Sequence, residues 1–225
     1  MRITEIGKLS VMQFTWDVLD SNSFALEGEK SILIIDPVDS EDLYAYAAQK
    51  QEALILLTHA HFDHICGLNR LRSIIPRTTV ATSLSCSSNI QDPKKNLSSI
   101  ANPLMAFHEH RDEIRDEIEP FACQPADITF EGELQMEWKG MSVYLTEFSG
   151  HSSDSLCILI DDKYLFSGDT ILPIPTVTRL PGGSTKAFWQ EDVPKLQAMQ
   201  RTVCMVFPGH GLPGKLGEML AVNKL

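Results

Sequence analysis

Short apolar segments separated by turn residues recur along the first third of the chain. Three of these segments are predicted strands: Val11–Trp16, Ser23–Leu26 and Ser31–Ile35. Between them, Asp20–Asn22 and Gly28–Glu29 have the composition of turns. The pattern therefore predicts that the fold begins with a small set of strands.

A helix and a fully buried strand are expected next. Asp36-Pro37 ends the third strand, and Asp39 or Ser40 is placed to cap a helix. The segment Ala53–Leu57 is wholly apolar, which is typical of a strand buried on both faces. The sequence THAHFDH starts directly after it, at the carboxyl end of a strand, where open α/β sheets bind their ligands.

The middle of the chain is more polar. A predicted strand at Thr78–Ala81 is followed by a serine-rich connection and then by Asn102-Pro103, which has the composition of a helix start. The helix predicted from there has a strongly acidic face, which we expect to be solvated. Its opposite face carries an apolar stripe of Leu104, Phe107, Ile114 and Ile118.

The second half returns to short strands and ends with one helix and one strand. The predicted strands are Ile128–Phe130, Leu134–Trp138, Met141–Glu147, Ser155–Ile160 and Tyr164–Phe166. The closing pair is a helix over Trp189–Met199 and a strand over Cys204–Phe207. This order indicates an α/β protein, and we expect residues 1–225 to form a single domain because no linker-like stretch divides them.

Composition mainly excludes functions. The formal net charge of −11 repels phosphate backbones, so nucleic acid is not an expected partner. The five cysteines are odd in number and never form a CxxC pair, which tells against a disulfide framework. The N-terminus lacks the apolar core of a signal peptide, and no run reaches transmembrane length. We therefore expect a cytoplasmic protein that is not bound to a membrane, and no motif indicates its oligomeric state.

Histidine and aspartate repeatedly follow the predicted strands. Imidazole nitrogen and carboxylate oxygen bind zinc and similar divalent ions, and neighbouring glycines allow the sharp turns that direct them inward. One tetrahedral ion needs fewer donors than the chain supplies, whereas two ions that share one ligand would use them all. The candidate donors are His59, His61, Asp63, His64, His151, Asp169 and His210.

The spacing within THAHFDH strengthens this interpretation. Three imidazoles so close together repel one another when protonated and have no packing reason to gather, so metal binding explains the run better than a structural role. His108 and His110 belong to no such pattern, and we expect ordinary surface or core roles for them.

Four motifs, taken in this order, resemble those of the metallo-β-lactamase superfamily. They are HxHxDH at 59–64, GHSSDS at 150–155, SGDT at 167–170 and PGHG at 208–211. Asp36 in IIDP also matches an aspartate that the family carries after an early strand, where it usually supports the site. The resemblance spans nearly the whole chain and implies a four-layer αβ/βα sandwich, with two sheets back to back and helices outside.

The resemblance also implies how the donors divide between two divalent ions. One ion would take His59, His61 and His151, the other Asp63, His64 and His210, with Asp169 as the bridge between them. No expected ligand is missing, which implies an active enzyme in which a hydroxide held between the ions attacks the substrate. Coordination lowers the pKa of water from about 15.7 to about 7. Zinc is the expected metal, and the same ligands accept iron or manganese.

Within the superfamily, the segment Asp169–Ser184 resembles the glyoxalase II group. Its aspartate-threonine is followed by an arginine and a PGGS-like turn, so Arg179 is expected to contact the substrate. Proteins of that group continue past the last histidine motif into a helical domain that helps bind glutathione, whereas this chain ends at Leu225. We therefore expect a short glyoxalase-II-like hydrolase that acts on another small-molecule thioester, whose thiol leaves readily as an anion.

Other activities stay open. Lactone or phosphodiester hydrolysis would use the same two-metal site. A persulfide dioxygenase would use a single iron in the first site and would keep its activity without Asp63, which the hydrolase requires as a catalytic residue. We also expect residues 83–120 to arch over the metals as part of the substrate pocket.

Overall fold

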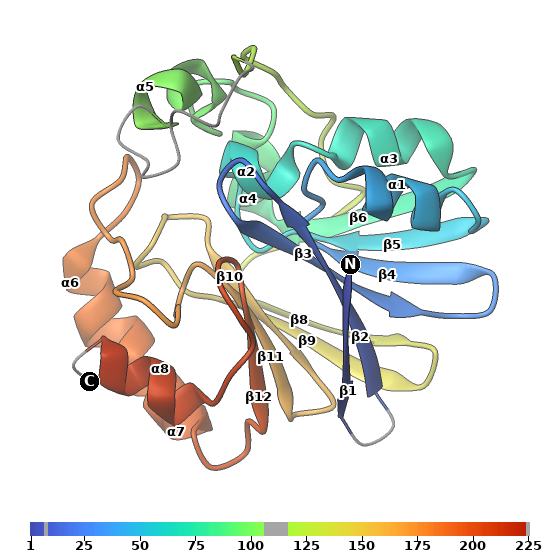
Figure 1. Cartoon of the computed structure of the whole chain (residues 1–225). Helices are drawn as coiled ribbons and strands as arrows, with labels where there is room; N and C mark the ends of the chain where they lie inside the picture. Colours follow the sequence, from blue (N-terminus) through green and yellow to red (C-terminus); the bar gives the residue numbers. More distant parts are fainter. Residues whose placement is uncertain (7–8, 106–116, 224–225) are drawn as a thin grey trace.

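Two β-sheets face each other across a shared apolar layer (Figure 1). The computed structural model describes residues 1–6, 9–105 and 117–223. The first sheet has seven strands, which lie in the order β1 (Arg2–Ile6), β2 (Leu9–Trp16), β3 (Ser21–Glu27), β4 (Ser31–Ile35), β5 (Glu52–Leu56), β6 (Arg77–Ser83) and β7 (Ile128–Phe130). The second has five, in the order β12 (Met205–Pro208), β11 (Tyr164–Gly168), β10 (Leu156–Ile160), β9 (Met141–Glu147) and β8 (Glu133–Trp138).

Both sheets combine antiparallel and parallel pairing. Strands β1 to β4 pair antiparallel, and β4 to β7 pair parallel. In the second sheet, β8 to β11 are antiparallel, and β12 is parallel to β11. The carboxyl ends of β4, β5 and β6 therefore share one edge of the first sheet, as those of β11 and β12 do in the second.

The central strands are buried on both faces, which explains their nearly continuous apolar sequences. In β4, Ile32 and Ile34 pack toward the helices outside the first sheet, whereas Leu33 and Ile35 enter the core between the sheets. In β10, Ile158 faces the same central core, and Cys157 packs against the helices outside the second sheet.

Helices cover the two outer faces (Figure 1). The first sheet is covered by α1 (Glu41–Ala47), α3 (Leu68–Ile74) and α4 (Leu84–Asn89), and the second by α7 (Val193–Met199) and α8 (Leu216–Val222). The remaining helical turns are α2 (Phe62–Ile65), η1 (Ser98–Ile100), α5 (Ala101–Met105), α6 (Thr185–Ala187) and the π-helix η3 (Phe188–Asp192). This arrangement confirms the predicted αβ/βα sandwich. None of the helices described has the length and apolar character needed to span a bilayer.

Some elements differ from the sequence prediction. Ser21 and Asn22, which were expected in a turn, are the buried first residues of β3. Strand β1 and helices α4 and α8 were not predicted at all. The helix expected over Trp189–Met199 begins earlier, at Thr185 with α6, and the predicted range itself is covered by the π-helix η3 and by α7.

The middle helix also differs. It begins at Ala101, and Asn102 does not cap it, because the Asn102 side chain accepts from the backbone N–H of Ile118 at 2.9 Å and donates to its carbonyl oxygen at 3.1 Å. Residues 106–116 of the predicted helix, with His108 and His110, lie outside the described residues, and Ile118, which was expected on its apolar stripe, is not in a helix.

Three aromatic rings join the two sheets at the centre of the core. The Phe166 and Phe207 rings are stacked with centroids 4.7 Å apart, and Phe24 from the opposite sheet meets both edge-on at 5.6 and 5.4 Å. We expect Phe166→Ala to lower the free energy of unfolding by about 3 to 5 kcal/mol, because it leaves a cavity between the sheets. Denaturant unfolding followed by circular dichroism measures the loss.

The matched control is Ile3→Ala on the edge strand β1, where the side chain is 52% exposed. It should change the free energy of unfolding by no more than about 0.5 kcal/mol. Equal losses for the two variants would contradict the placement of Phe166 in the shared core.

Candidate metal centre

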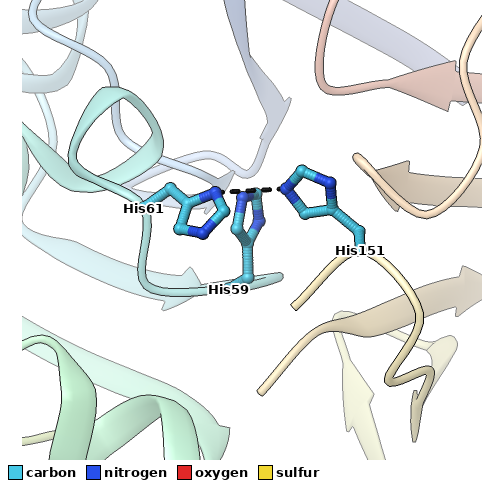
Figure 2. Close-up of side chains that lie close together, drawn as sticks. All are labelled: His59, His61 and His151. Carbon is cyan, nitrogen blue, oxygen red and sulfur yellow. Dashed lines mark hydrogen bonds between the residues drawn. The ribbon is translucent and has the colours of Figure 1, made fainter. Parts of the chain in front are cut away.

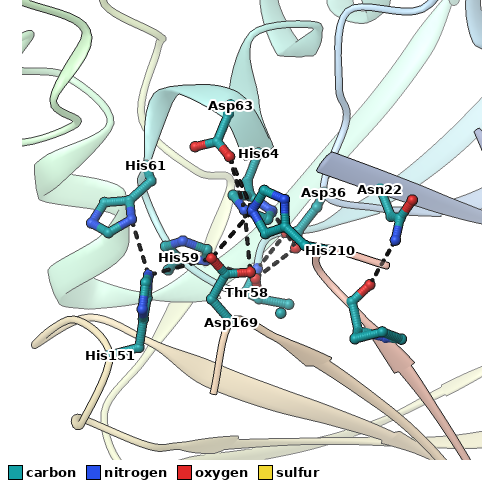
Figure 3. A network of polar contacts seen from close by, with 12 residues as sticks. Asn22, Asp36, Thr58, His59, His61, Asp63, His64, His151, Asp169 and His210 are labelled. Atoms are coloured by element: carbon teal, nitrogen blue, oxygen red, sulfur yellow. Dashed lines mark hydrogen bonds and ion pairs between the residues drawn. The ribbon is translucent and has the colours of Figure 1, made fainter. Parts of the chain in front are cut away.

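The seven predicted donors, which come from four separate motifs, meet at one edge of the two sheets (Figure 3). THAHFDH begins where β5 ends and leads into α2. The other three donors follow strands of the second sheet: His151 comes after β9, Asp169 after β11 and His210 after β12. All but His210 are buried, and His210 is partly exposed.

His59, His61 and His151 form the first cluster, in which the three rings turn their nitrogens toward a common point (Figure 2). Their donor atoms all lie within 4.8 Å of one another. The Nε2 atom of His151 is 3.1 Å from Nδ1 of His61. Three imidazoles with converging nitrogens can hold one divalent ion.

Asp63, His64 and His210 form the second cluster. Oδ2 of Asp63 lies 3.3 Å from Nε2 of His64 and 3.3 Å from Nε2 of His210. Their donor atoms also fall within 4.8 Å of one another. This set can hold a second ion.

The carboxylate of Asp169 lies between the two clusters. Its Oδ2 atom is 3.6 Å from Nε2 of His151 in the first cluster and 3.4 Å from Nε2 of His210 in the second. Its Oδ1 atom is 3.5 Å from Nε2 of His64. The Asp169 carboxylate therefore lies within 3.6 Å of donor atoms in both clusters, which is the position of a bridging ligand.

Contacts behind the rings orient three of the histidines. The Nδ1 atom of His151 is 2.7 Å from the carbonyl oxygen of Val177, and that of His210 is 3.0 Å from the carbonyl oxygen of Leu19. A carbonyl oxygen only accepts, so each Nδ1 carries a proton and each Nε2 is the ring nitrogen left to bind a metal ion. Thr58 Oγ1, 3.0 Å from Nδ1 of His59, serves the same purpose.

Asp36 supports both clusters through its contacts with Thr58 and His64. Its carboxylate accepts from the backbone N–H of Thr58 at 2.7 Å and from the Thr58 hydroxyl at 2.6 Å, and it lies 3.4 Å from Nδ1 of His64. Asp36, His59 and His64 also form a compact group of donors. Because both Asp36 oxygens already accept hydrogen bonds, we assign it a supporting role.

Sequence reasoning missed two residues that fix the loops of the site. Asn22 donates its backbone N–H to the carbonyl of Gly209 at 2.7 Å and its amide to that of Gly211 at 2.8 Å, which holds the loop of His210 (Figure 3). Asp192, at the end of η3, accepts from the backbone N–H of Gly150 at 2.7 Å. What marks both residues is a polar side chain with almost no exposed surface. This feature can be recognised only once the fold is known.

Gly168 and Gly209 allow the strand ends to approach the site. Gly168 has a φ of +48°, and a Cβ there would come within 2.7 Å of the Cβ of Thr58. A Cβ at Gly209 would lie 2.2 Å from Oδ1 of Asp169 and 2.7 Å from Cε1 of His64. Glycine is required at both positions for steric reasons.

The first cluster favours neutral imidazoles. Burial lowers the pKa of His59 well below its ordinary value, and the neighbouring imidazoles lower it further. Burial and the adjacent His151 lower the pKa of His61 to about 3. Both rings are therefore free of a second proton at neutral pH and ready to bind a cation.

In the second cluster, by contrast, His64 and His210 favour the protonated form. Burial alone would lower the pKa of His64, but Asp63 and Asp169 raise it well above the ordinary value. The same two carboxylates outweigh burial at His210 and raise its pKa to about 10. Conversely, burial would raise the pKa of both carboxyls, but the histidines bring that of Asp63 to about 2 and that of Asp169 well below its ordinary value.

The donor set fits two metal ions. Among the residues that the structure describes, Nε2 of His59, Nε2 of His64 and Oδ1 of Asp169 have no hydrogen-bond partner although they are fully buried. Buried polar atoms without partners are costly, and metal coordination relieves that cost.

A cavity of about 350 Å³ opens onto both clusters. Every titratable side chain among its described lining residues belongs to the seven donors, and the rest of the wall is apolar. The apolar wall consists of Leu19, Phe62, Leu97, Leu104, Met105, Leu172, Ile174, Val177 and Leu180. Leu97, Leu104 and Met105 belong to residues 83–120, the expected cover. Arg179 is exposed and does not line this cavity, so its contact with substrate stays a prediction.

Residues 16–210 match the metallo-beta-lactamase superfamily, and this chain belongs to that superfamily, whose members are generally hydrolases. The hydroxyacylglutathione hydrolase of Glaesserella parasuis serovar 5 (strain SH0165) is 25% identical over 217 residues, which cover 93% of this chain and 70% of that protein. Across several hydroxyacylglutathione hydrolases that match, this chain covers 45% to 70% of their length.

Solved structures show the same fold. BLEG-1, a B3 metallo-beta-lactamase, superposes with a TM-score of 0.76 at 26% identity, over 95% of this chain and 97% of its own. TTHA1623, whose crystal structure is of a di-iron-bound form, has a TM-score of 0.71 at 23% identity, over 94% of this chain and 98% of its own. Divalent metals are thus the ligands typical of this superfamily.

The opposite protonation of the two clusters should be visible when metal binds. In the metal-free protein His64 and His210, with raised pKa values, each carry a second ring proton at pH 7 that must leave before the ring binds a cation, whereas His59 and His61 do not. We expect the second equivalent of zinc to release about two protons and the first to release fewer. Calorimetry in two buffers of different ionisation enthalpy counts the protons.

The sign follows from the raised pKa values. Lowering the pH strengthens the protons' hold on His64 and His210, so affinity in the second cluster should fall as pH falls, while the first cluster changes less. His210→Gln should lower the proton release by about one, because it removes one of the two protonated rings. Equal proton release by both equivalents would contradict the assignment.

Proposed function

We propose that this protein is a two-metal hydrolase that cleaves thioesters with an apolar acyl group. The observation that carries the proposal is the position of Asp169, which contacts a cluster of three histidines on one side and the Asp63–His64–His210 cluster on the other. The proposed ligands of the first ion are His59, His61 and His151, and those of the second are Asp63, His64 and His210, with Asp169 shared by both.

Two bound divalent ions supply a water-derived nucleophile at neutral pH and polarise the carbonyl that it attacks. The chain's own residues position and shield that chemistry. The carbonyls of Val177 and Leu19 keep His151 and His210 in the tautomer that presents Nε2. The apolar wall of the cavity excludes water and offers its surface to an acyl chain.

The lining of the cavity favours a thiol as the leaving group. Among its described lining residues, each titratable group is also a proposed metal ligand, so none is left to protonate the departing atom. A thiol with a pKa near about 8.5 leaves as an anion without such help, whereas an alcohol depends on it more strongly. This favours thioesters over ordinary esters, lactones and phosphodiesters.

The relatives support the class of reaction. A hydroxyacylglutathione hydrolase, by its name, hydrolyses a glutathione thioester, and it is similar to 93% of this chain. BLEG-1, by its name, hydrolyses β-lactams, so a β-lactam belongs in any substrate panel. Zinc is the proposed metal. TTHA1623 binds iron, and iron is therefore the first alternative to measure.

Asp63 distinguishes hydrolysis from oxidation at the same site. We expect protein purified without added metal to contain close to two metal ions per chain and to hydrolyse thioesters. Asp63→Ala should lower kcat/KM more than about 100-fold, since even loss of a ligand's outer partner costs about 10 to 100-fold. Elemental analysis measures the metal content, and a thioester panel that also includes esters and a β-lactam measures kcat/KM.

A matched control is Asp162→Ala, which removes a carboxylate from the exposed turn after β10. Its kcat/KM should equal that of the native protein. One iron per chain, no turnover of esters and oxygen uptake with a persulfide that persists in the Asp63 variant would point instead to a dioxygenase.

Leu104 and Met105 test whether residues 83–120 govern substrate choice. Both line the apolar cavity opposite the donors contributed by the strand ends. We expect Leu104→Ala with Met105→Ala to shift the preferred acyl chain toward longer ones, with kcat/KM for a short acyl chain lower by about 10 to 100-fold, because each truncated side chain removes apolar contact worth about 1 to 3 kcal/mol. Thioesters of increasing chain length on one thiol measure the shift.

Leu84→Ala in α4 is the control, because Leu84 is exposed and does not line the cavity. An unchanged chain-length preference in the Leu104 and Met105 variant would remove these two residues from the determinants of acyl-chain specificity.

A further inference from the structure

A second cavity, of about 320 Å³, adjoins the metal centre and differs from the first in character. The two cavities share His61 and Leu97 in their walls. The first is walled by aliphatic side chains, whereas the second is bounded by Lys94, Lys95 and Asn89. A substrate whose reacting carbonyl lies at His61 can therefore extend in two directions, one apolar and one basic.

The two lysines are held in place by a turn that is tied to the metal centre. The backbone N–H of Lys94 donates to the Asp92 carboxylate at 2.9 Å, and the backbone N–H of Lys95 donates to the Asp92 carbonyl oxygen at 2.9 Å. The next residue, the buried Asn96, accepts at its carbonyl from the N–H of Phe62 at 2.8 Å. Phe62 follows the donor His61, so the lysine turn is fixed relative to the proposed ligands.

The charge of this cavity departs from that of the protein as a whole. The chain has a net charge of −11, and Lys94–Lys95 is its sole pair of adjacent basic residues. Within the described residues, no carboxylate lies within 4.0 Å of either ammonium group. Two adjacent cations repel each other, and an anion bound between them relieves the repulsion.

The wall also contains one buried carboxylate, that of Asp154. Asp154 is 97% buried, and one of its oxygens accepts from the Ser152 hydroxyl at 2.7 Å, while the other has no exposed surface. Its Oδ2 has no hydrogen-bond partner among the described residues, and the carboxylate is buried, whereas both lysines are exposed where a ligand can reach them. The exposed Ser153, which precedes Asp154 in the chain and lies beside Gly182, offers a hydroxyl donor to the cavity.

We propose that the cavity of Lys94 and Lys95 binds an anionic group, a carboxylate or a phosphate, on the thiol part of the substrate. This inference rests on the proposed hydrolase activity and makes its substrate more specific. The acyl group enters the apolar cavity, the thioester carbonyl lies beside His61, and the anion of the departing thiol reaches the two ammonium groups. The lysines are specificity determinants and take no part in bond breaking.

The test compares one acyl group on three thiols: N-acetylcysteamine, which is neutral, mercaptoacetate, which carries a carboxylate, and phosphopantetheine, which carries a phosphate. Lys94→Ala with Lys95→Ala should raise KM for the favoured anionic thioester by about 10-fold and leave kcat within about twofold, because two exposed ion pairs are lost. The neutral thioester should be unaffected. The anionic thioester whose KM rises more in the double alanine variant identifies the anion that the cavity binds.

Two controls accompany the double variant. Lys94→Arg with Lys95→Arg keeps both charges and should keep a low KM, and Lys163→Ala removes an exposed lysine from the turn after β10 and should change nothing. Raising the salt concentration should raise KM of the native enzyme for the anionic substrate only. An unchanged KM for both anionic substrates in the alanine variant would overturn the proposal.

A binding measurement separates failure of this inference from failure of the hydrolase proposal. The probes are S-hexyl mercaptoacetate, a thioether that cannot be hydrolysed, and its neutral amide, titrated by calorimetry. Even if no thioester is turned over, tighter binding of the acid than of the amide, lost in the Lys94 and Lys95 alanine variant, would support the anion site. Equal binding of acid and amide by the native protein would exclude it.

Discussion

The Asp36 carboxylate is the interaction on which the metal centre depends. It lies at the carboxyl end of β4 with a φ of +52°, a conformation that costs free energy for a residue other than glycine. From there it binds the backbone and hydroxyl of Thr58 and approaches His64 from behind. Thr58 in turn contacts His59, so one buried side chain orients a donor in each cluster. The strain is offset by these hydrogen bonds and explains why an aspartate stands where the chain must turn sharply.

The two-sheet architecture brings the remaining donors to the same place. Parallel strands end at a common edge, and the second sheet presents β11 and β12 opposite β4 and β5 across the central core. The donors therefore sit on short connections anchored by buried strands, where their positions are well defined. Asn22 shows how closely the sheets cooperate, because a residue of β3 in the first sheet holds the loop of His210 after β12 in the second. Rigid supports of this kind suit a site that must keep two ions at a fixed separation.

The sequence predicted those parts of the fold and the site whose physical signal is local in the chain. Ser31–Ile35 and Ala53–Leu57 were recognisable because burial on both faces leaves an uninterrupted apolar run, and the histidine motif was recognisable because imidazoles rarely gather without a ligand. Strand β1 is an exposed edge strand and has no such signature, and α4 is made of serines that favour turns as readily as helices. Asn22 and Asp192 hold the loops of the site through Gly209, Gly211 and Gly150, which are distant from them in sequence. Arg179 was inferred from a motif, and the structure leaves it exposed outside the cavity.

The electrostatics of the centre explain how two buried carboxylates are tolerated with or without metal. In the metal-free protein, Asp63 and Asp169 are ionised, and the protons on His64 and His210 compensate them. Bound cations would take over that compensation as the protons leave, so the buried carboxylates would not be left without a partner. The first cluster has no carboxylate of its own, and its His59 and His61 rings stay neutral. Asp169 links the two clusters and thereby makes the charge of one depend on the occupancy of the other, so filling the two positions should be coupled rather than independent.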